Sequence, residues 1–293
     1  MSLLTITPTL PGAANGVAWR PQGDLIAVAH DTSPFLSVVR TSDGAVDSGW
    51  PTLEGQGNGV AWSPDGSRLA VAHFTSPFLT VIDVNTKTAE TGWPTPANLG
   101  YSVAWSPDGA RLALGHAVSG SSAALLVVNV ASKAAEGGWP SLGGAGARSN
   151  GVAWSPDGSR LAVARQLTPF LSVVDTATGL AEGGWPTLPS TGNGVAWSPD
   201  GQKLAAAHNN VPRLTVIVAA TKAVESGWPT LASNGQRVAW HPDGSRLAAA
   251  HDGGTGLSVF TTADKAPETG WSAPGGNGGG VAWAWDPGNS LSG

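Results

Sequence analysis

The sequence contains no cysteine, which excludes disulfide bonds, thiolate nucleophiles and zinc sites built on sulfur ligands. Charged residues are also scarce: they make up 12% of the chain, and the 15 Lys and Arg residues form no run. A surface that follows nucleic-acid phosphates needs clustered Lys and Arg. Because the formal net charge is −5 and the basic residues are scattered, we expect no nucleic-acid partner.

Long apolar runs are absent as well. The longest, around residues 123–128, is far shorter than the ~20 residues that a membrane-spanning helix requires. The first ten residues contain neither a basic segment nor a long apolar segment, so we expect no secretory signal peptide. The sequence therefore predicts a protein without a membrane segment or a membrane partner.

Tryptophan, in contrast, is abundant, with 14 residues, and 13 of them belong to two periodic series. The first series ends a Val-Ala-Trp tripeptide and recurs every 43 residues, with one interval of 49. The second series follows a glycine and alternates with the first. The two series are Trp19, Trp62, Trp105, Trp154, Trp197, Trp240 and Trp283, and Trp50, Trp93, Trp139, Trp185, Trp228 and Trp271. Such self-similarity is the signature of a tandem repeat.

Each repeat is predicted to contain four short strands. In the second repeat, a strand at residues 59–62 precedes a Pro-Asp-Gly turn, and apolar or β-branched strands follow at 68–73 and 78–83. A polar loop then leads to the Gly-Trp-Pro-Thr segment at residues 92–95, and no segment shows a sustained helical period. Four antiparallel strands in about 43 residues is the size of one β-propeller blade, so the fold class is all-β.

The repeats predict a single β-propeller domain over residues 1–293, with six full repeats at about 16–274. A seventh inner-strand signature begins at Gly280, and Pro8 aligns with the repeat proline Pro51. We therefore predict seven blades of four antiparallel strands, the seventh being composite or incomplete and made from residues 280–293 plus 3–10. Two alternatives stay open: a six-bladed ring with spare ends, or a missing strand supplied by a partner chain.

The repeat carries a family resemblance. VAWSPDGSRLAVAH followed by PFLTVID resembles the WD40 consensus, although Asn-Gly replaces its Gly-His pair and its closing Trp-Asp pair is missing. Asn-Gly-Val-Ala-Trp-Ser-Pro-Asp-Gly, with Thr-Ser-Pro-Phe, is similar to repeats of bacteriophage and prophage structural proteins. That resemblance implies a virion component or a phage-encoded adhesion module. The implied location is a virion if the chain is phage-encoded, and otherwise the cytoplasm.

The polar residues that could carry chemistry follow the repeat. Most acidic residues stand at equivalent turn or loop positions, and no nucleophile, phosphate-loop or metal-ligand motif occurs, so we predict no enzyme activity, catalytic residue, cofactor or metal. Five histidines and one arginine end the second strands: His30, His73, His116, His208, His251 and Arg165. Because packed sheets stand about 10 Å apart, these side chains should not converge on a metal, and each should make a structural hydrogen bond to a neighbouring loop.

The loops between the second and third strands contain the candidate interaction surface. Its residues are Phe35, Phe74, Phe78, Phe170 and Arg213. These side chains either protrude as a contact patch on one face of the disc or point between blades as core. The Gly-Trp tryptophans likewise either stack on sugars or pack against the adjacent blade.

The preferred function is a non-enzymatic structural or interaction scaffold that binds other proteins, such as virion proteins or copies of itself. The alternative is a carbohydrate-binding propeller, either lectin-like or active in host adhesion.

Overall fold

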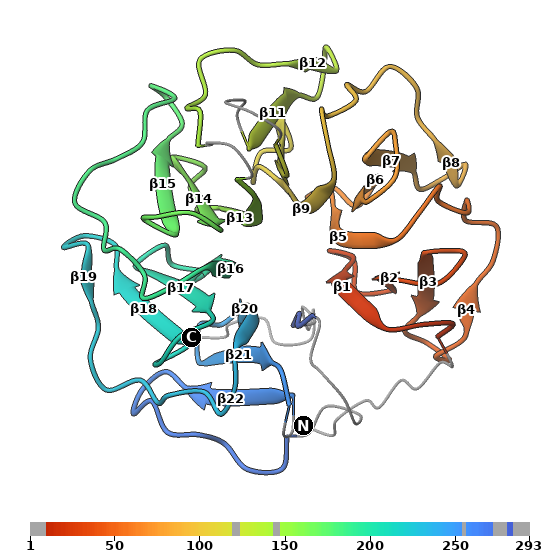
Figure 1. Ribbon diagram of the computed structural model, residues 1–293. Helices are drawn as coiled ribbons and strands as arrows, with labels where there is room; N and C mark the ends of the chain where they lie inside the picture. The colour runs from red at the N-terminus through yellow and green to blue at the C-terminus, as the bar shows by residue number, and fades with distance from the viewer. Residues whose placement is uncertain (1–9, 119–123, 143–146, 254–255, 272–279, 284–293) are drawn as a thin grey trace, which may run out of the picture.

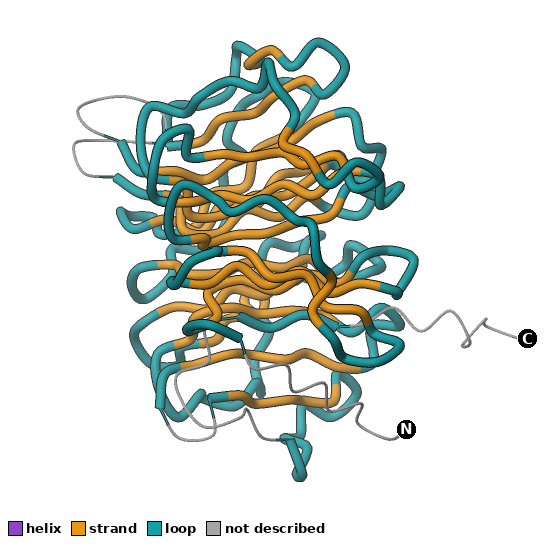
Figure 2. The backbone as a smooth tube through the Cα atoms, turned by 90° about the vertical axis from the view of Figure 1, so that its right-hand side faces the viewer, coloured by secondary structure: helices purple, strands orange, loops and turns teal. Residues whose placement is uncertain are grey.

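The computed structural model describes residues 10–118, 124–142, 147–253, 256–271 and 280–283. In this part of the chain six antiparallel sheets stand around a central axis like the blades of a propeller, which confirms the all-β prediction (Figure 1). Viewed from the side, the strands run between two faces that are formed by loops (Figure 2). No helix among these residues has the length and apolar character needed to cross a membrane.

Each blade begins with its innermost strand and continues outward in chain order. Blades 1 to 3 are β1 (Ala14–Trp19), β2 (Leu25–His30), β3 (Leu36–Arg40) and β4 (Val46–Asp47); β5 (Gly57–Trp62), β6 (Arg68–His73), β7 (Leu79–Asp83) and β8 (Thr88–Ala89); and β9 (Gly100–Trp105), β10 (Arg111–His116), β11 (Leu125–Asn129) and β12 (Ala134–Ala135). Blades 4 to 6 are β13 (Ser149–Trp154), β14 (Arg160–Arg165) and β15 (Leu171–Asp175); β16 (Gly192–Trp197), β17 (Lys203–His208), β18 (Leu214–Val218) and β19 (Ala223–Val224); and β20 (Gly235–Trp240), β21 (Arg246–His251) and β22 (Leu257–Thr261). In blades 4 and 6, single bridges at Ala181 and Pro267 stand where the fourth strand would be.

The second strand of each blade is buried on both faces, and its sequence explains why. In β6, Leu69 and Val71 pack with blade 1, whereas Ala70 and Ala72 pack with blade 3. Successive side chains of a strand point to opposite faces, so an uninterrupted apolar run serves two neighbouring blades at once. Complete burial of one such leucine stabilises the fold by roughly 1.5–3 kcal/mol, and a blade that stood alone would lose this contribution on both faces.

The predicted number of seven blades was wrong, because the described residues form six blades of three or four strands. Val-Ala-Trp marks an inner strand only, and a blade also requires the second and third strands that follow it. The segment 280–283 stands beside β20, where Trp283 Nε1 donates to the carbonyl oxygen of Ala239 at 2.9 Å, but it is not a β-strand. The other residues assigned to the seventh blade, 3–9 and 284–293, lie outside the described residues.

Tryptophans form the seams between neighbouring blades. Trp62 Nε1, on the inner strand of blade 2, donates to the carbonyl oxygen of Ala18 in blade 1 at 3.1 Å. The Gly-Trp residue of blade 1, Trp50, meets the Trp62 ring edge-on at a centroid distance of 5.9 Å. The same pairing recurs at the next four seams, with centroid distances of 5.9–6.1 Å. The two tryptophan series of the sequence are therefore the two halves of one inter-blade contact.

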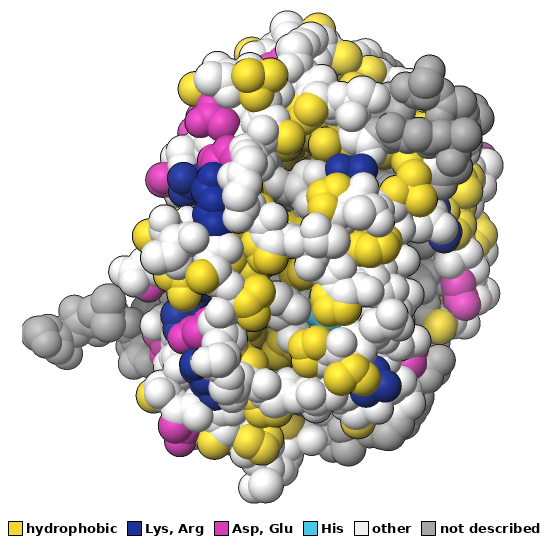
Figure 3. Space-filling view, turned by 60° about the vertical axis from the view of Figure 1, so that its left-hand side comes forward, with side chains coloured by type: hydrophobic (Ala, Val, Ile, Leu, Met, Phe, Trp, Pro, Cys, Tyr) yellow, Lys and Arg dark blue, Asp and Glu magenta, His cyan; other side chains and the backbone are white. Residues whose placement is uncertain are grey.

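A lysine covers the second tryptophan series at four of the five seams between blades that are consecutive in the chain. At the first seam, Lys87 Nζ lies 5.7 Å from the Trp50 ring centroid and 2.7 Å from Asp47 Oδ2. Lys133, Lys222 and Lys265 repeat this arrangement. At the seam between blades 3 and 4, Gly179 occupies the lysine position and Arg111 lies over Trp139 instead. Figure 3 shows such basic and acidic side chains next to one another along one side of the molecule.

Candidate functional site

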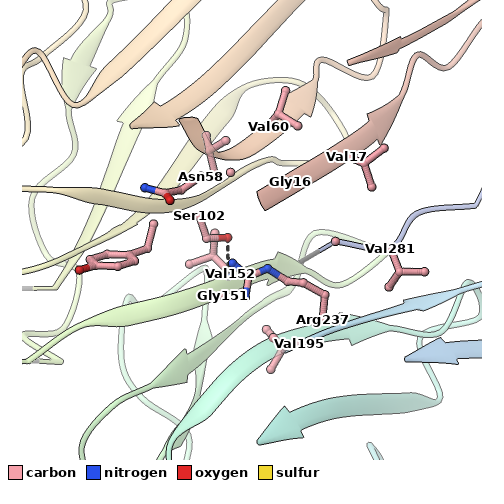
Figure 4. Close-up of a pocket in the computed structure, with 15 residues that line it drawn as sticks. Gly16, Val17, Asn58, Val60, Ser102, Gly151, Val152, Val195, Arg237 and Val281 are labelled. Atoms are coloured by element: carbon pink, nitrogen blue, oxygen red, sulfur yellow. Dashed lines mark hydrogen bonds between the residues drawn. The ribbon is translucent and has the colours of Figure 1, made fainter. Parts of the chain in front are cut away.

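A cavity lies at the centre of the ring, between the innermost strands of the six blades and residues 280–283 (Figure 4). It contains about 540 Å³ of empty space, part of which is open to solvent. Equivalent valines supply much of the apolar half of its wall, and polar groups supply the other half. These valines are Val17, Val60, Val103, Val152, Val195 and Val281.

Glycine precedes most of these valines because adjacent inner strands approach one another closely at this position. A Cβ atom on Gly59 would lie 2.8 Å from Ser102 Cα, and one on Gly16 would lie 2.4 Å from the carbonyl oxygen of Asn58. Ordinary van der Waals contact between carbon atoms occurs at about 3.5–4.0 Å. The equivalent residues in chain order are Gly16, Gly59, Ser102, Gly151, Gly194, Arg237 and Gly280. Ser102 and Arg237 are therefore the two departures from a position that the packing reserves for glycine.

Arg237 adds a positive charge to the cavity wall. Its Nη1 donates to the carbonyl oxygens of Asn193 at 2.9 Å and Gln236 at 3.0 Å. Burial lowers the pKa of the guanidinium, which nevertheless stays protonated in proteins. Ser102 also lines the cavity, and its Oγ accepts a hydrogen bond from the backbone N–H of Val152 at 3.1 Å.

Arg237 is not among the residues predicted from the sequence, because catalytic or metal-binding groups were expected among the acidic residues and histidines. The signal was present in the sequence. When the repeats are aligned on Val-Ala-Trp, Arg237 is the one charged residue at a position occupied five times by glycine.

The end of the cavity at Asn58 and Tyr101, here named its mouth, lies toward the face that bears the loops between second and third strands, here named the loop face. Four asparagines, one step before the glycine position, donate from Nδ2 to the first carbonyl oxygen of the next inner strand at 2.8–2.9 Å. They are Asn15, Asn58, Asn150 and Asn193. In blade 3 this position holds Tyr101, so the repeated hydrogen bond is replaced by an aromatic ring.

Tyr101 is the centre of a cluster that joins blades 2, 3 and 4. Phe74 meets its ring edge-on at a centroid distance of 5.1 Å, and the Arg148 guanidinium lies 5.4 Å from the ring centroid. Arg148 donates to the Tyr101 hydroxyl at 3.3 Å and to Gln166 Oε1 at 2.7 Å. These four residues, named here the mouth cluster, stand where other repeats carry different residue types, so the cluster is unique within the ring.

The structure places the other predicted interaction residues at separate seams. Phe35, Phe78, Phe170 and Arg213 are equivalent residues of four blades, and each is half-buried with a positive φ of 63–69°. Phe35 and Phe170 pack partly against the apolar cores that blades 1 and 4 share with the blades that follow them. Arg213 Nη1 donates to the carbonyl oxygen of Leu231 at 2.8 Å. Of the predicted set, the mouth cluster includes Phe74.

The histidines that end the second strands have structural partners. His30, His73, His208 and His251 each contact a Ser or Thr hydroxyl seven residues later, on the third strand of the same blade, at 2.8–3.0 Å. The predicted structural hydrogen bond is therefore present, but its usual partner is a strand hydroxyl rather than a neighbouring loop. Burial lowers the pKa of His208 to about 4, so this ring is neutral at pH 7. Among the described residues, no group of His, Asp and Glu is arranged to bind a metal ion.

The repeated acidic residues have structural partners too. In the turns, the Ser63 hydroxyl donates to Asp65 Oδ1 at 2.6 Å, which together with backbone hydrogen bonds lowers the pKa of that carboxyl. At the seams, Glu90 accepts from Trp93 Nε1 at 3.1 Å. Burial acts to raise the pKa of Glu90, but hydrogen bonds from Lys133, Arg68 and Trp93 outweigh it and the pKa falls below its usual value. These carboxylates are held ionised, which suits a structural role rather than that of a general acid.

The Gly-Trp tryptophans pack against the adjacent blade, as the second of the two sequence interpretations states. Each described member meets the next inner tryptophan edge-on, and a Lys or Arg lies over the ring at five positions: Trp50, Trp93, Trp139, Trp185 and Trp228. A sugar-stacking platform requires a free aromatic face. The seam tryptophans therefore offer a poor surface for carbohydrate.

Comparison with known proteins supports the fold alone. No family model and no curated protein matches the chain. Among solved structures, the chain is similar to one described as Kuenenia stuttgartiensis Hydrazine Synthase, with a TM-score of 0.73 and 18% sequence identity over 88% of this chain and 78% of that one. The class that the fold and the site define is a β-propeller with a central cavity and one loop face on which the repeat symmetry is broken.

Proposed function

We propose that this protein is a non-enzymatic interaction module that binds a protein partner through its loop face. The observation that carries the proposal is the distribution of residues that depart from the repeat. On the opposite face, five of the six turns keep Pro-Asp-Gly, and Ser-Asp hydrogen bonds recur there. On the loop face several equivalent positions differ from blade to blade, those of the mouth cluster among them, as a surface shaped for one partner would.

The composition of the loop face supports a protein partner. Leu167 is 40% exposed and Val211 is 61% exposed, and they lie in the equivalent loops of adjacent blades 4 and 5. The mouth cluster adds the aromatic residues Phe74 and Tyr101 with Arg148. Protein interfaces are enriched in aromatic residues and arginine around an apolar centre. A virion setting, which the resemblance of the repeats implies, stays a prediction.

The test compares two substitutions of exposed valines, Val211→Asp on the loop face and Val224→Asp on the outer strand β19, which is 55% exposed. Wild type and both variants are immobilised and exposed to extract from the source organism, and native mass spectrometry measures self-association of each. We expect a specific partner, or a defined oligomer, that Val211→Asp loses and Val224→Asp retains. Equal capture and equal oligomeric state for all three proteins would contradict the proposal.

A second candidate function, carbohydrate binding, is favoured by one observation, the Phe74–Tyr101 aromatic pair beside Arg148 and Gln166 at the cavity mouth. Amide and guanidinium groups beside an aromatic ring are suited to sugar hydroxyls and sugar faces. A glycan array tests it with Tyr101→Asn, which restores the residue of the neighbouring repeats. Hits that this variant loses would support carbohydrate binding, and an array without hits for wild type would exclude it.

A further inference from the structure

The cavity contains a cation whose hydrogen-bonding capacity is only partly used. A guanidinium has five N–H donors, and the two hydrogen bonds of Arg237 both come from Nη1 and both end on backbone carbonyl oxygens. No ion pair joins Arg237 to any carboxylate of the described residues, in contrast to the arginines of the seams, such as Arg68 with Glu90 at 2.7 Å. Within the described part of the chain, the charge therefore has no counter-ion inside the ring.

The remaining donors of Arg237 face the cavity. Arg165 and Arg213 each have an Nε that is sealed in protein without a partner, whereas no nitrogen of Arg237 is sealed in this way. The side chain points into the cavity in the direction of Gly151 and Ser102 (Figure 4). A partly buried charge that lacks a partner is unfavourable, so an anion in the cavity would stabilise the folded protein.

The wall determines which anion fits. It contains one cation, no carboxylate, six valines and several glycines, with Ser102 as an additional hydroxyl. The Ser102 Oγ accepts from Val152 and keeps its own O–H for donation. One guanidinium balances one negative charge, and it binds carboxylates through two parallel hydrogen bonds. A phosphate dianion would leave a second charge without a cation, so the charge balance favours a monoanion, and the six valines favour one with an apolar body.

We propose that the central cavity is a binding site for a small aliphatic carboxylate, with its carboxylate on Arg237 near Ser102 and its hydrocarbon part against the valines. This site lies inside the ring, so it does not depend on the loop-face partner of the proposed function. The carboxylate could belong to a free acid or to the C-terminal residue of a polypeptide, and the experiment separates these two sources.

Isothermal titration calorimetry at pH 7 tests the site with sodium butyrate, the neutral isostere butyramide, and inorganic phosphate. We expect wild type to bind butyrate and to bind neither butyramide nor phosphate measurably. Arg237→Gly should weaken butyrate binding by at least about tenfold, since hydrogen bonds to a charged group are lost. This variant carries the glycine that five equivalent positions already hold, and thermal unfolding should show that it folds.

Two further variants keep the test decisive. Arg237→Met retains an apolar side chain of similar length and should also lose butyrate. Arg213→Gly is the matched control, because it removes another half-buried arginine, at a φ of 69° that glycine adopts freely, and it should bind butyrate as wild type does. The peptide acetyl-Gly-Ala-Val, with a free or an amidated C-terminus, identifies the source. Tighter binding of the free-acid peptide than of butyrate indicates a polypeptide terminus, and the reverse order indicates a free acid.

Three results would overturn the proposal. They are an absence of butyrate and peptide binding by wild type, equal butyrate binding by Arg237→Gly and wild type, and tighter binding of phosphate than of butyrate.

Discussion

The close approach of the inner strands makes the glycine position a quantitative test of the ring. In Gly59→Ala, the new Cβ would lie 2.8 Å from Ser102 Cα, 3.1 Å from the Tyr101 carbonyl oxygen and 3.1 Å from Val103 N. All three atoms are backbone of β9, so no side chain can turn away to relieve the contact. Strands β5 and β9 must move apart by roughly 1 Å to restore ordinary van der Waals distances.

Two opposing effects set the size of the change. Overpacking of this kind costs about 1–3 kcal/mol, whereas replacing glycine by alanine stabilises a protein by about 0.4–1 kcal/mol through the unfolded chain. We therefore expect Gly59→Ala to lower the free energy of unfolding by about 1–2 kcal/mol. For a domain of this size the melting temperature should fall by about 2–8 °C, measured by differential scanning calorimetry.

Glycine-to-alanine substitutions at two other positions show how the loss of stability depends on the distance to neighbouring atoms. Gly183→Ala places its Cβ in open space without a positive φ, so its stability should equal or slightly exceed that of wild type. Gly151→Ala has its nearest contacts at 3.1 Å, to Asn193 O and Gly194 Cα, and should fall between the other two variants. A Gly59→Ala protein that melts at or above the wild-type temperature would refute the reasoning, as would an equal loss in Gly183→Ala.

Three other predictions concern the seams, the buried histidines and the segment at residues 280–283. Lys133→Met removes a partly exposed ion pair with Glu90. In urea unfolding it should lower the free energy of unfolding by about 0.5–1 kcal/mol at low salt and by less at about 1 M salt. A loss that does not depend on salt would contradict this account. Burial lowers the pKa of His208 from 6.5 to about 4, so its contribution to the free energy of unfolding is complete above pH 6.5 and is lost as the pH falls from 6.5 through 4. Over this window wild type should lose about 3 kcal/mol of stability that His208→Gln does not lose. Parallel pH profiles of stability for the two proteins would refute this prediction. Trp283→Phe removes the hydrogen bond to Ala239 and should lower the free energy of unfolding by about 1 kcal/mol, whereas an unchanged urea midpoint would show that residues 280–283 do not stabilise the ring.

Much of the fold follows from the repeat itself. The predicted strand at residues 68–73 coincides with β6, and the strand predicted at 78–83 differs from β7 by one residue. These boundaries were predictable because turn residues and apolar runs act locally. The number of blades was not, because Trp283 carries the inner-strand signature and even its hydrogen bond, whereas a blade depends on the pairing of residues that follow.

The candidate site was less predictable than the fold. The aligned repeats mark Arg237 as a charged residue at a glycine position, but its place in a cavity wall follows only from the closure of the ring around its side chain. The mouth cluster similarly joins Phe74, Tyr101 and Arg148 from three blades that lie apart in the sequence. Sequence periodicity identifies positions that differ between repeats, but only the arrangement of blades shows which of those positions meet.

The lysines of the seams have a mechanical consequence. At four seams a lysine of one blade stabilises the contact with the preceding blade, because it lies over a tryptophan and forms an ion pair there. At the seam between blades 3 and 4, Gly179 stands at the lysine position. A lysine cannot be added there without rearrangement, because a Cβ on Gly179 would lie 2.4 Å from the carbonyl oxygen of Gly138. The five joints between blades that are consecutive in the chain therefore differ in strength, and among these five the joint between blades 3 and 4 is where thermal motion would first let the blades move relative to each other.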